Sequence, residues 1–128
     1  MPAKLAALGI VTADTLQSVR FYRELGVDVA DPESGADHHE ATLPNGLRLM
    51  WDTVEMMRKL DPDWQQPQGH PIALAFECDS PGDVDATYAR VTQAGFQGKT
   101  DPFDAFWGQR YATLLDPDGN AVDLFAPF

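Results

Sequence analysis

Residues 116–120 read Asp-Pro-Asp-Gly-Asn and join two short stretches of mixed apolar and polar residues, 110–115 and 121–125. Proline presets the backbone of a tight turn, and glycine accepts the positive φ that such a turn often requires. Two strand-like stretches joined by this turn predict a β-hairpin. We therefore expect residues 121–125 to form a strand that pairs within a sheet.

A weaker copy of this hairpin occurs earlier, where residues 44–46 (Pro-Asn-Gly) separate residues 38–43 from 47–53. The proline and the glycine of the two turns are both 73 residues apart. The stretch from Asp14 to Gly26 also has a counterpart, from Asp83 to Gly95, at an offset of 69 residues. Two features that repeat in the same order indicate a chain made of two similar halves.

Each half is predicted to have the order β-α-β-β-β. Asp14 is a suitable N-cap for the first helix, and Ser80 followed by Pro81 is a suitable start for the second. Gly26 and Gly95 follow the helix ends. The expected strands are 5–11, 27–30, 38–43 and 47–53 in the first half, and 72–78, 96–100, 110–115 and 121–125 in the second.

The intervening residues do not repeat. Residues 53–60 are predicted to form a short amphipathic helix, and 61–69 an ordered linker with Trp64. Residues 101–108 are expected to form a loop. We predict one domain over residues 1–128, with a first module at 1–53, a linker at 54–70 and a second module at 71–128.

Composition limits the classes of function. The 128 residues have 44% hydrophobic content, contain no apolar run near the ~20 residues of a membrane span, and show no basic-then-apolar leader. We expect a cytoplasmic protein, in agreement with a single cysteine, Cys78, which excludes an intrachain disulfide. A net charge of −11 argues against nucleic acid or anionic membranes as partners. The charge favours a cationic ligand, or it serves only solubility.

These features resemble the vicinal-oxygen-chelate superfamily, which includes glyoxalase I, extradiol dioxygenases, fosfomycin-modifying enzymes and bleomycin-resistance binding proteins. The likeness covers nearly the whole chain. It rests on Asp14, Ser18-Val19-Arg20-Phe21-Tyr22, Leu25-Gly26, Trp107-Gly108 and Asp116-Pro117-Asp118-Gly119-Asn120. The resemblance implies an α+β fold in which two βαβββ modules form a cupped mixed sheet, usually within a homodimer. It leaves the activity open, because one scaffold hosts unrelated chemistries.

Metal-dependent members of that family carry one ligand on the first strand and one on the last strand of each module. The resemblance places these positions at Ala7, at Ile72 or Ala73, at Met50 and at Asp123. One carboxylate cannot hold a divalent ion, which needs roughly three or four donors. We therefore expect no metal and no cofactor.

Three histidines are the obvious substitutes for the missing ligands. His38 and His39 are adjacent in a predicted strand, so their side chains point to opposite faces and cannot ligate together. His70 precedes a strand. We expect all three at the surface, and a site that joins one of them to Asp52 or Asp123 remains an alternative.

Strand alternation assigns the residues that face the cup. Val122 and Leu124 should pack on the helices, as should Leu49 and Trp51 in the first module. Tyr111 and Thr113 share one face, but the sequence does not say which. Together with the aromatic residues of the loops, the predicted ligand-binding set is Arg48, Met50, Asp52, Trp64, Phe103, Phe106, Trp107, Tyr111, Asp123 and Phe125.

An apolar, aromatic cup suits a flat organic molecule. We expect a non-enzymatic protein without catalytic residues that sequesters an aromatic, drug-like molecule, as in the bleomycin-resistance branch and its role in antibiotic resistance. One alternative is a metal-dependent lyase, isomerase or dioxygenase with displaced ligands. Another is a metal-free enzyme with Asp123 as general base. Arg48 or Arg110 is the expected partner of Asp123.

Overall fold

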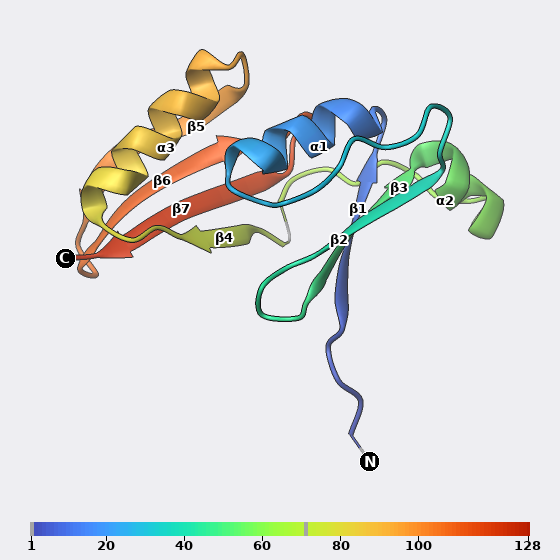
Figure 1. The fold of residues 1–128 in the computed structure, drawn as a ribbon, viewed down its shortest axis with the longest axis horizontal. Helices are drawn as coiled ribbons and strands as arrows, with labels where there is room; N and C mark the ends of the chain where they lie inside the picture. The colour runs from blue at the N-terminus through green and yellow to red at the C-terminus, as the bar shows by residue number, and fades with distance from the viewer. Residues whose placement is uncertain (1, 71) are drawn as a thin grey trace. The chain divides into compact units, whose positions relative to one another are not determined.

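The computed structural model describes residues 2–70 and 72–128, and Pro71, where the second module is predicted to begin, lies outside them. The described residues form an α+β fold with seven strands and three helices (Figure 1). The chain divides into two compact units, Met1–Pro67 and Gln68–Phe128. None of the helices in the described part of the chain is long and apolar enough to cross a bilayer.

The first unit contains a three-stranded mixed sheet in the order β1-β3-β2. β1 (Ala7–Thr12) pairs in parallel with β3 (Arg48–Thr53), and β2 (His38–Thr42) pairs antiparallel with β3. Helix α1 (Thr15–Glu24) connects β1 to β2, and the short α2 (Val54–Leu60) follows β3. The predicted hairpin and both predicted helices are confirmed.

Helix α1 starts where the sequence predicts. An oxygen of the Asp14 side chain accepts a hydrogen bond from the backbone N–H of Gln17, which satisfies one of the free donors of the first turn. The buried side of the helix carries Val19, Phe21 and Tyr22, each fully buried. Ser18 on the same side accepts a hydrogen bond from the indole N–H of Trp51, so α1 packs on the β3 face that carries Trp51.

The strand predicted at residues 27–30 is wrong. Val27 and Val29 are buried, but the segment is irregular, and the first module is therefore β-α-β-β. The backbone carbonyls of this segment are used by side chains: the Arg23 guanidinium donates twice to Val29, and the His39 ring contacts the Ala30 carbonyl at 2.8 Å. The apolar pattern predicted the burial of Val27 and Val29 correctly. Their segment, however, forms hydrogen bonds with side chains in place of those with a neighbouring strand.

The second unit contains a four-stranded mixed sheet in the order β4-β7-β6-β5. The strands are β4 (Leu74–Glu77), β5 (Gln97–Ala105), β6 (Gln109–Leu115) and β7 (Ala121–Pro127). Helix α3 (Pro81–Gln93) begins at the predicted cap, Ser80, and lies over one face of β5, β6 and β7 (Figure 1). This module has the predicted β-α-β-β-β order.

The loop predicted at residues 101–108 is also wrong, because β5 runs to Ala105 and only residues 106–108 turn into β6. Pro102 lies inside β5, where proline usually argues against a strand. β5 is the edge of the sheet, and its pairing with β6 shifts register between Thr100 and Phe103. An edge with a bulge tolerates a residue that cannot donate to the ladder.

The two hairpins have the same hydrogen bonds. The Leu43 N–H donates to Leu47, and the Asp116 N–H donates to Asn120. Gly46 and Gly119 have φ of 88° and 85°, values that favour glycine. The structure therefore confirms the repeat at this point and places Met50 and Asp123 at equivalent positions of β3 and β7.

Candidate functional site

The second sheet has one covered face and one open face. On β7, Val122 and Leu124 are buried against α3, as predicted, whereas Asp123 and Phe125 alternate to the other face and are half-buried. Cross-strand pairing extends the open face to both neighbouring strands. Its members include Ala75 on β4, Asp123 and Phe125 on β7, Tyr111 and Thr113 on β6, and Phe103 on β5.

Aromatic rings gather at one end of this open face. The rings of Phe103 and Trp107 lie 6.3 Å and 5.3 Å from the ring of Tyr111, in edge-to-face arrangements. Phe106 lies 5.0 Å from Trp107. Exposure is 39% for Phe103, 48% for Trp107 and 96% for Phe106, so these rings are not part of the core of the unit. Exposed, clustered rings are one of the features by which binding surfaces are recognised.

Asp123 is held by two hydroxyl groups. The Tyr111 hydroxyl donates to Oδ2 at 2.5 Å, and the Thr113 hydroxyl donates to Oδ1 at 2.8 Å. The face shared by Tyr111 and Thr113 is thus the open one. The expected arginine partner is wrong: Arg110 pairs with Asp85 and Asp104, and Arg48 pairs with Glu40.

The phenol of Tyr111 is the proton donor in this pair. Burial, the hydrogen bond to Asp123 and the charge of that carboxylate together raise the pKa of Tyr111 to about 12. All three effects favour the neutral phenol over the charged phenolate. Tyr111 therefore serves as a hydrogen-bond donor that orients Asp123, and not as a base near neutral pH.

The open face of the first sheet is arranged as three cross-strand rows. Leu49 and Trp51 are buried on the opposite face, as predicted. Met50 lies between Gly9 and Glu40, and its Cε lies 3.9 Å from the position a Cβ would take at Gly9. The rows are Ala7–Arg48–Thr42, Gly9–Met50–Glu40 and Val11–Asp52–His38, so the β1 side of this face carries only small apolar residues.

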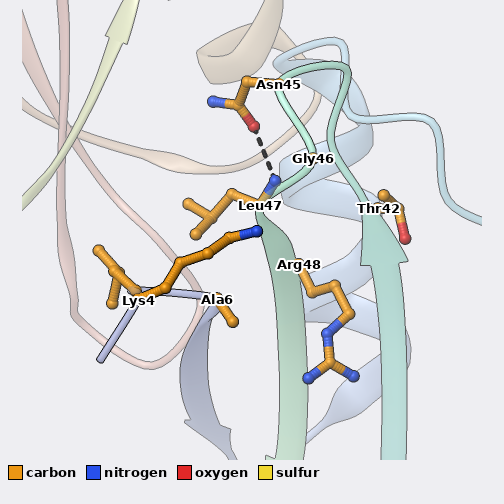
Figure 2. Close-up of a pocket in the computed structure, with 8 residues that line it drawn as sticks. Lys4, Ala6, Thr42, Asn45, Gly46, Leu47 and Arg48 are labelled. Carbon is orange, nitrogen blue, oxygen red and sulfur yellow. Dashed lines mark hydrogen bonds between the residues drawn. The ribbon is translucent and has the colours of Figure 1, made fainter. Parts of the chain in front are cut away.

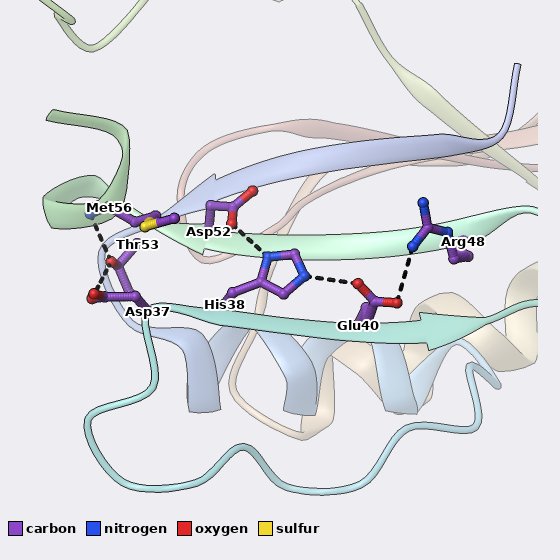
Figure 3. A network of polar contacts seen from close by, with 7 residues as sticks. All are labelled: Asp37, His38, Glu40, Arg48, Asp52, Thr53 and Met56. Carbon is purple, nitrogen blue, oxygen red and sulfur yellow. Dashed lines mark hydrogen bonds and ion pairs between the residues drawn. The ribbon is translucent and has the colours of Figure 1, made fainter. Parts of the chain in front are cut away.

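A chain of four charged or titratable side chains crosses that face (Figure 3). His38 contacts Asp52 through Nδ1 at 2.6 Å and Glu40 through Nε2 at 2.7 Å. Glu40 also accepts from Arg48 at 3.2 Å. The hydrogen bonds to Asp52 and to Glu40 raise the pKa of His38, and the bond to His38 lowers the pKa of Glu40.

The end of this face continues into α2 (Figure 3). The Thr53 hydroxyl accepts from the backbone N–H of Met56, which caps α2, and it donates to Asp37. Asp37 also accepts from Lys59 at 2.8 Å, and the hydrogen bond to Lys59 lowers the pKa of Asp37. These contacts fix the start of α2, and they leave Asp37 paired with the charge of Lys59.

A shallow hollow lies between the N-terminal segment and the turn of the β2–β3 hairpin (Figure 2). It is lined by Lys4, Leu5, Ala6, Thr42, Asn45, Gly46, Leu47 and Arg48. The Asn45 side chain accepts from the N–H of Leu47 within the turn, and Arg48 is already paired with Glu40. The hollow has exposed walls and no convergent reactive groups, so we do not regard it as the functional site.

The sequence model of the Glyoxalase/Bleomycin resistance protein/Dioxygenase superfamily matches residues 4–124. The chain belongs to this superfamily. No curated protein sequence matches it.

Solved structures of superfamily members share the fold. A glyoxalase/bleomycin resistance protein/dioxygenase family enzyme from Burkholderia phytofirmans PsJN is 19% identical, with a TM-score of 0.84 over 98% of this chain and 100% of that one. A glyoxalase-related enzyme from Fulvimarina pelagi is 20% identical, with a TM-score of 0.83 over 96% and 87%. A lactoylglutathione lyase from Agrobacterium tumefaciens is 16% identical, with a TM-score of 0.70 over 98% and 94%.

Metal-dependent members of the superfamily hold an ion, and the described donors of each unit do not fit one. On the second sheet the cross-strand neighbour of Asp123 on β4 is Ala75, and on the first sheet Gly9 is the neighbour of Met50. Both ring nitrogens of His38 point at carboxylates on opposite sides of the ring, so these three groups do not converge on one point. No group of three or more His, Cys, Asp or Glu suited to an ion occurs in residues 2–70 and 72–128.

The structure brings the predicted site residues together in two sets. Phe103, Phe106, Trp107 and Tyr111 form the ring cluster, Tyr111 bonds to Asp123, and Phe125 is the β7 partner of Tyr111. Arg48 and Asp52 belong to the polar chain of the first sheet beside Met50. No described contact joins Trp64 to either set; its backbone N–H donates to Asp61.

Sequence reasoning missed the roles of His38, Glu40 and Thr113. The hairpin contained the signal for the first two, because counting outward from the turn at 44–46 pairs His38 with Asp52 and Glu40 with Met50. A histidine and a glutamate two residues apart then share a face with Asp52. Thr113 required the side of β6 to be known.

Proposed function

We propose that this superfamily member is a small-molecule-binding protein that sequesters a flat, aromatic, drug-like ligand without a metal. The proposal rests on one observation: the partly exposed rings of Phe103, Trp107 and Tyr111 lie together on an open sheet face, next to Asp123. Aromatic groups beside a small number of oriented polar groups are typical of ligand sites.

The arrangement of the rings supports binding more than core packing. The large residues that close the core, Trp51, Tyr22 and Phe21, are fully buried on covered faces. Trp107 and Phe103 keep exposed surface on the open face, where a planar ligand can stack or approach edge-on. Homodimer formation, cytoplasmic location and ligand contacts from Arg48, Met50, Asp52, Trp64 and Phe125 are further parts of this proposal.

Tryptophan fluorescence tests the proposal directly. A panel of aromatic antibiotics that includes bleomycin is titrated into the protein, with thermal unfolding as a second readout. We expect at least one member to quench emission and raise the melting temperature, and Trp107→Phe to remove most of the quenching. Trp51 is fully buried, so its emission is the internal reference that the ligand should not quench. Trp64→Phe separately measures the contribution of Trp64, which the proposal also places at the ligand. No quenching and no thermal shift at saturating concentrations would contradict the proposal.

A metal-dependent lyase, isomerase or dioxygenase remains the second candidate. It is favoured by Asp123, a carboxylate at the last-strand position where the superfamily resemblance places a ligand. Elemental analysis after dialysis distinguishes the two functions, since a stoichiometric ion would favour the enzyme. Recovery of the bound ligand then shows whether it is unchanged or chemically altered.

A further inference from the structure

Asp123 is a carboxylate whose partners are neutral. Both oxygens accept from hydroxyl groups, those of Tyr111 and Thr113, and no described residue offers it a cation within ion-pair distance. Arg110, the cationic residue of the adjacent strand, is bonded to Asp85 and Asp104 instead. A carboxylate can accept about four hydrogen bonds, so Asp123 keeps part of its accepting capacity.

The two cross-strand neighbours of Asp123 have small side chains. Its neighbour on β4 is Ala75, which is exposed, and Thr113 is its neighbour on β6. Neither side chain is large enough to cover the carboxylate. Asp123 is half-buried, so part of it remains in contact with solvent, where a ligand group can reach it.

The ring cluster provides a second attraction for positive charge. Tyr111 connects the two features, because its hydroxyl bonds to Asp123 and its ring contacts those of Phe103 and Trp107. The faces of aromatic rings attract cations, and quaternary ammonium groups are bound in this way. The surrounding unit is acidic, with nine Asp and Glu against three Lys and Arg in residues 68–128.

We propose that Asp123 and the rings of Tyr111, Trp107 and Phe103 form a recognition site for an organic ammonium ion attached to a flat ring system. This inference rests on the proposed function and names the ligand class. The site takes an organic cation rather than a metal ion, since one carboxylate flanked by Ala75 gives too few ligands for a metal. An ammonium ion needs only a counter-charge and ring faces.

The test compares two probes of nearly equal shape that differ by one charge. Calorimetric titrations with phenyltrimethylammonium and with its neutral carbon analogue, tert-butylbenzene, measure the contribution of the charge. We expect the cation to bind about tenfold more tightly, from the usual range of cation–π and exposed ion-pair energies. A third titration with Mn²⁺ or Zn²⁺ is expected to show no stoichiometric binding.

Variants assign the preference to the site. Asp123→Asn should remove most of the preference for the cation, leaving only the part that the ring faces supply, and should leave the affinity for tert-butylbenzene within about twofold. Asp79→Asn, which removes the same charge from an exposed loop of the same unit, should change neither affinity more than about twofold. Tyr111→Phe keeps the ring and removes the hydroxyl, so it should reduce the preference partially. Trp107→Ala should lower the affinity for both probes.

The outcomes separate the two proposals. Equal affinities for both probes in the wild-type protein overturn the ammonium site and leave the aromatic-binding function standing. Binding of neither probe, with no binding across the antibiotic panel, overturns the function and this inference together. A stoichiometric metal that Asp123→Asn removes overturns the ammonium site in favour of the enzyme. If Asp123→Asn fails to fold, Tyr111→Phe carries the same test, because a preference for the cation that this variant leaves undiminished overturns the ammonium site.

Discussion

The two sheets of this protein share a framework and differ in the partners of the carboxylates on their open faces. In both, a first strand lies parallel to the last strand of its hairpin, and Met50 and Asp123 occupy equivalent positions. On the first sheet, Asp52 and Glu40 are paired with His38 and Arg48. On the second, Asp123 has only hydroxyl partners and is joined to aromatic rings. The comparison suggests that a repeated fold can leave one face balanced and reserve the other for a ligand.

The covered faces should tolerate far less change than the open ones. Trp51 is fully buried and bonded to Ser18, whereas Trp107 is 48% exposed. We expect Trp51→Ala to lower the free energy of unfolding by about 3–5 kcal/mol, because it leaves a large cavity and an unpaired hydroxyl. Trp107→Ala should cost about 1 kcal/mol or less. Urea denaturation of both variants measures the difference, and similar losses would mean that Trp107 belongs to the core.

Two glycines give the next largest contrast. A Cβ at Gly98 would overlap the Tyr88 side chain, which packs there and donates to Asp101 at 2.8 Å. Gly98→Ala should therefore cost about 1–3 kcal/mol through overpacking. Gly9→Ala meets only the Met50 terminal methyl, at 3.9 Å, and should change stability by less than about 0.5 kcal/mol.

The glycine prediction has an internal control. Tyr88→Ala removes the side chain that the new methyl group would meet, so Gly98→Ala should cost much less in that background. An undiminished cost in the double variant would place the problem in the backbone of β5 instead. Thermal or urea unfolding of the four proteins completes the cycle.

The charge balance of the first sheet should depend on pH. A neutral imidazole has one N–H, so His38 can donate to both Asp52 and Glu40 only when it is protonated. The raised pKa of His38 makes its contribution fully present below the unfolded value of about 6.5 and lost as the pH rises through the folded value. Three charged groups near this polar chain are themselves in ion pairs: Arg48 with Glu40, and Lys59 with Asp37. Helix α2 also carries Glu55 and Arg58.

The His38→Asn variant measures this contribution. The stability difference from the wild-type protein should be about 1 kcal/mol or less at pH 6, since the pair is partly exposed, and smaller at pH 9. His70→Asn, in the exposed linker, should show no such pH dependence. A difference that grew with pH would mean that His38 is stabilised in its neutral form.

The sequence was sufficient for the framework because local chemistry determines it. The signals that define it each depend on neighbours a few residues away in the sequence. They are the helix caps at Asp14 and Ser80, the glycine turns, and the alternation of Leu49, Trp51, Val122 and Leu124. The irregular segment 27–30 depended on hydrogen bonds from side chains such as Arg23, and the strand through Pro102 depended on its pairing with β6. The pairing of Tyr111 with Asp123 required the register of β6 against β7, which no single strand reveals.

The smallest expected effect is spectroscopic and concerns the Tyr111–Asp123 pair itself. Asp123→Asn removes the charge that opposes the phenolate, so the pKa of Tyr111 should fall from about 12 towards the ordinary value of about 10. The pKa should remain above that ordinary value, because burial is the first cause of the raised pKa and persists in the variant.

The titration of Tyr111 can be followed by NMR. Tyrosine labelled with ¹³C at Cζ resolves the three tyrosines during an alkaline titration, and Tyr111→Phe assigns the signal. A raised pKa gives its stabilising contribution in full below the unfolded value of about 10, so the wild-type protein should lose this contribution as the pH rises from about 10 through about 12. An unchanged Tyr111 titration in Asp123→Asn would show that the carboxylate is not coupled to the phenol, and the contrast between the two open faces would then rest on the rings alone.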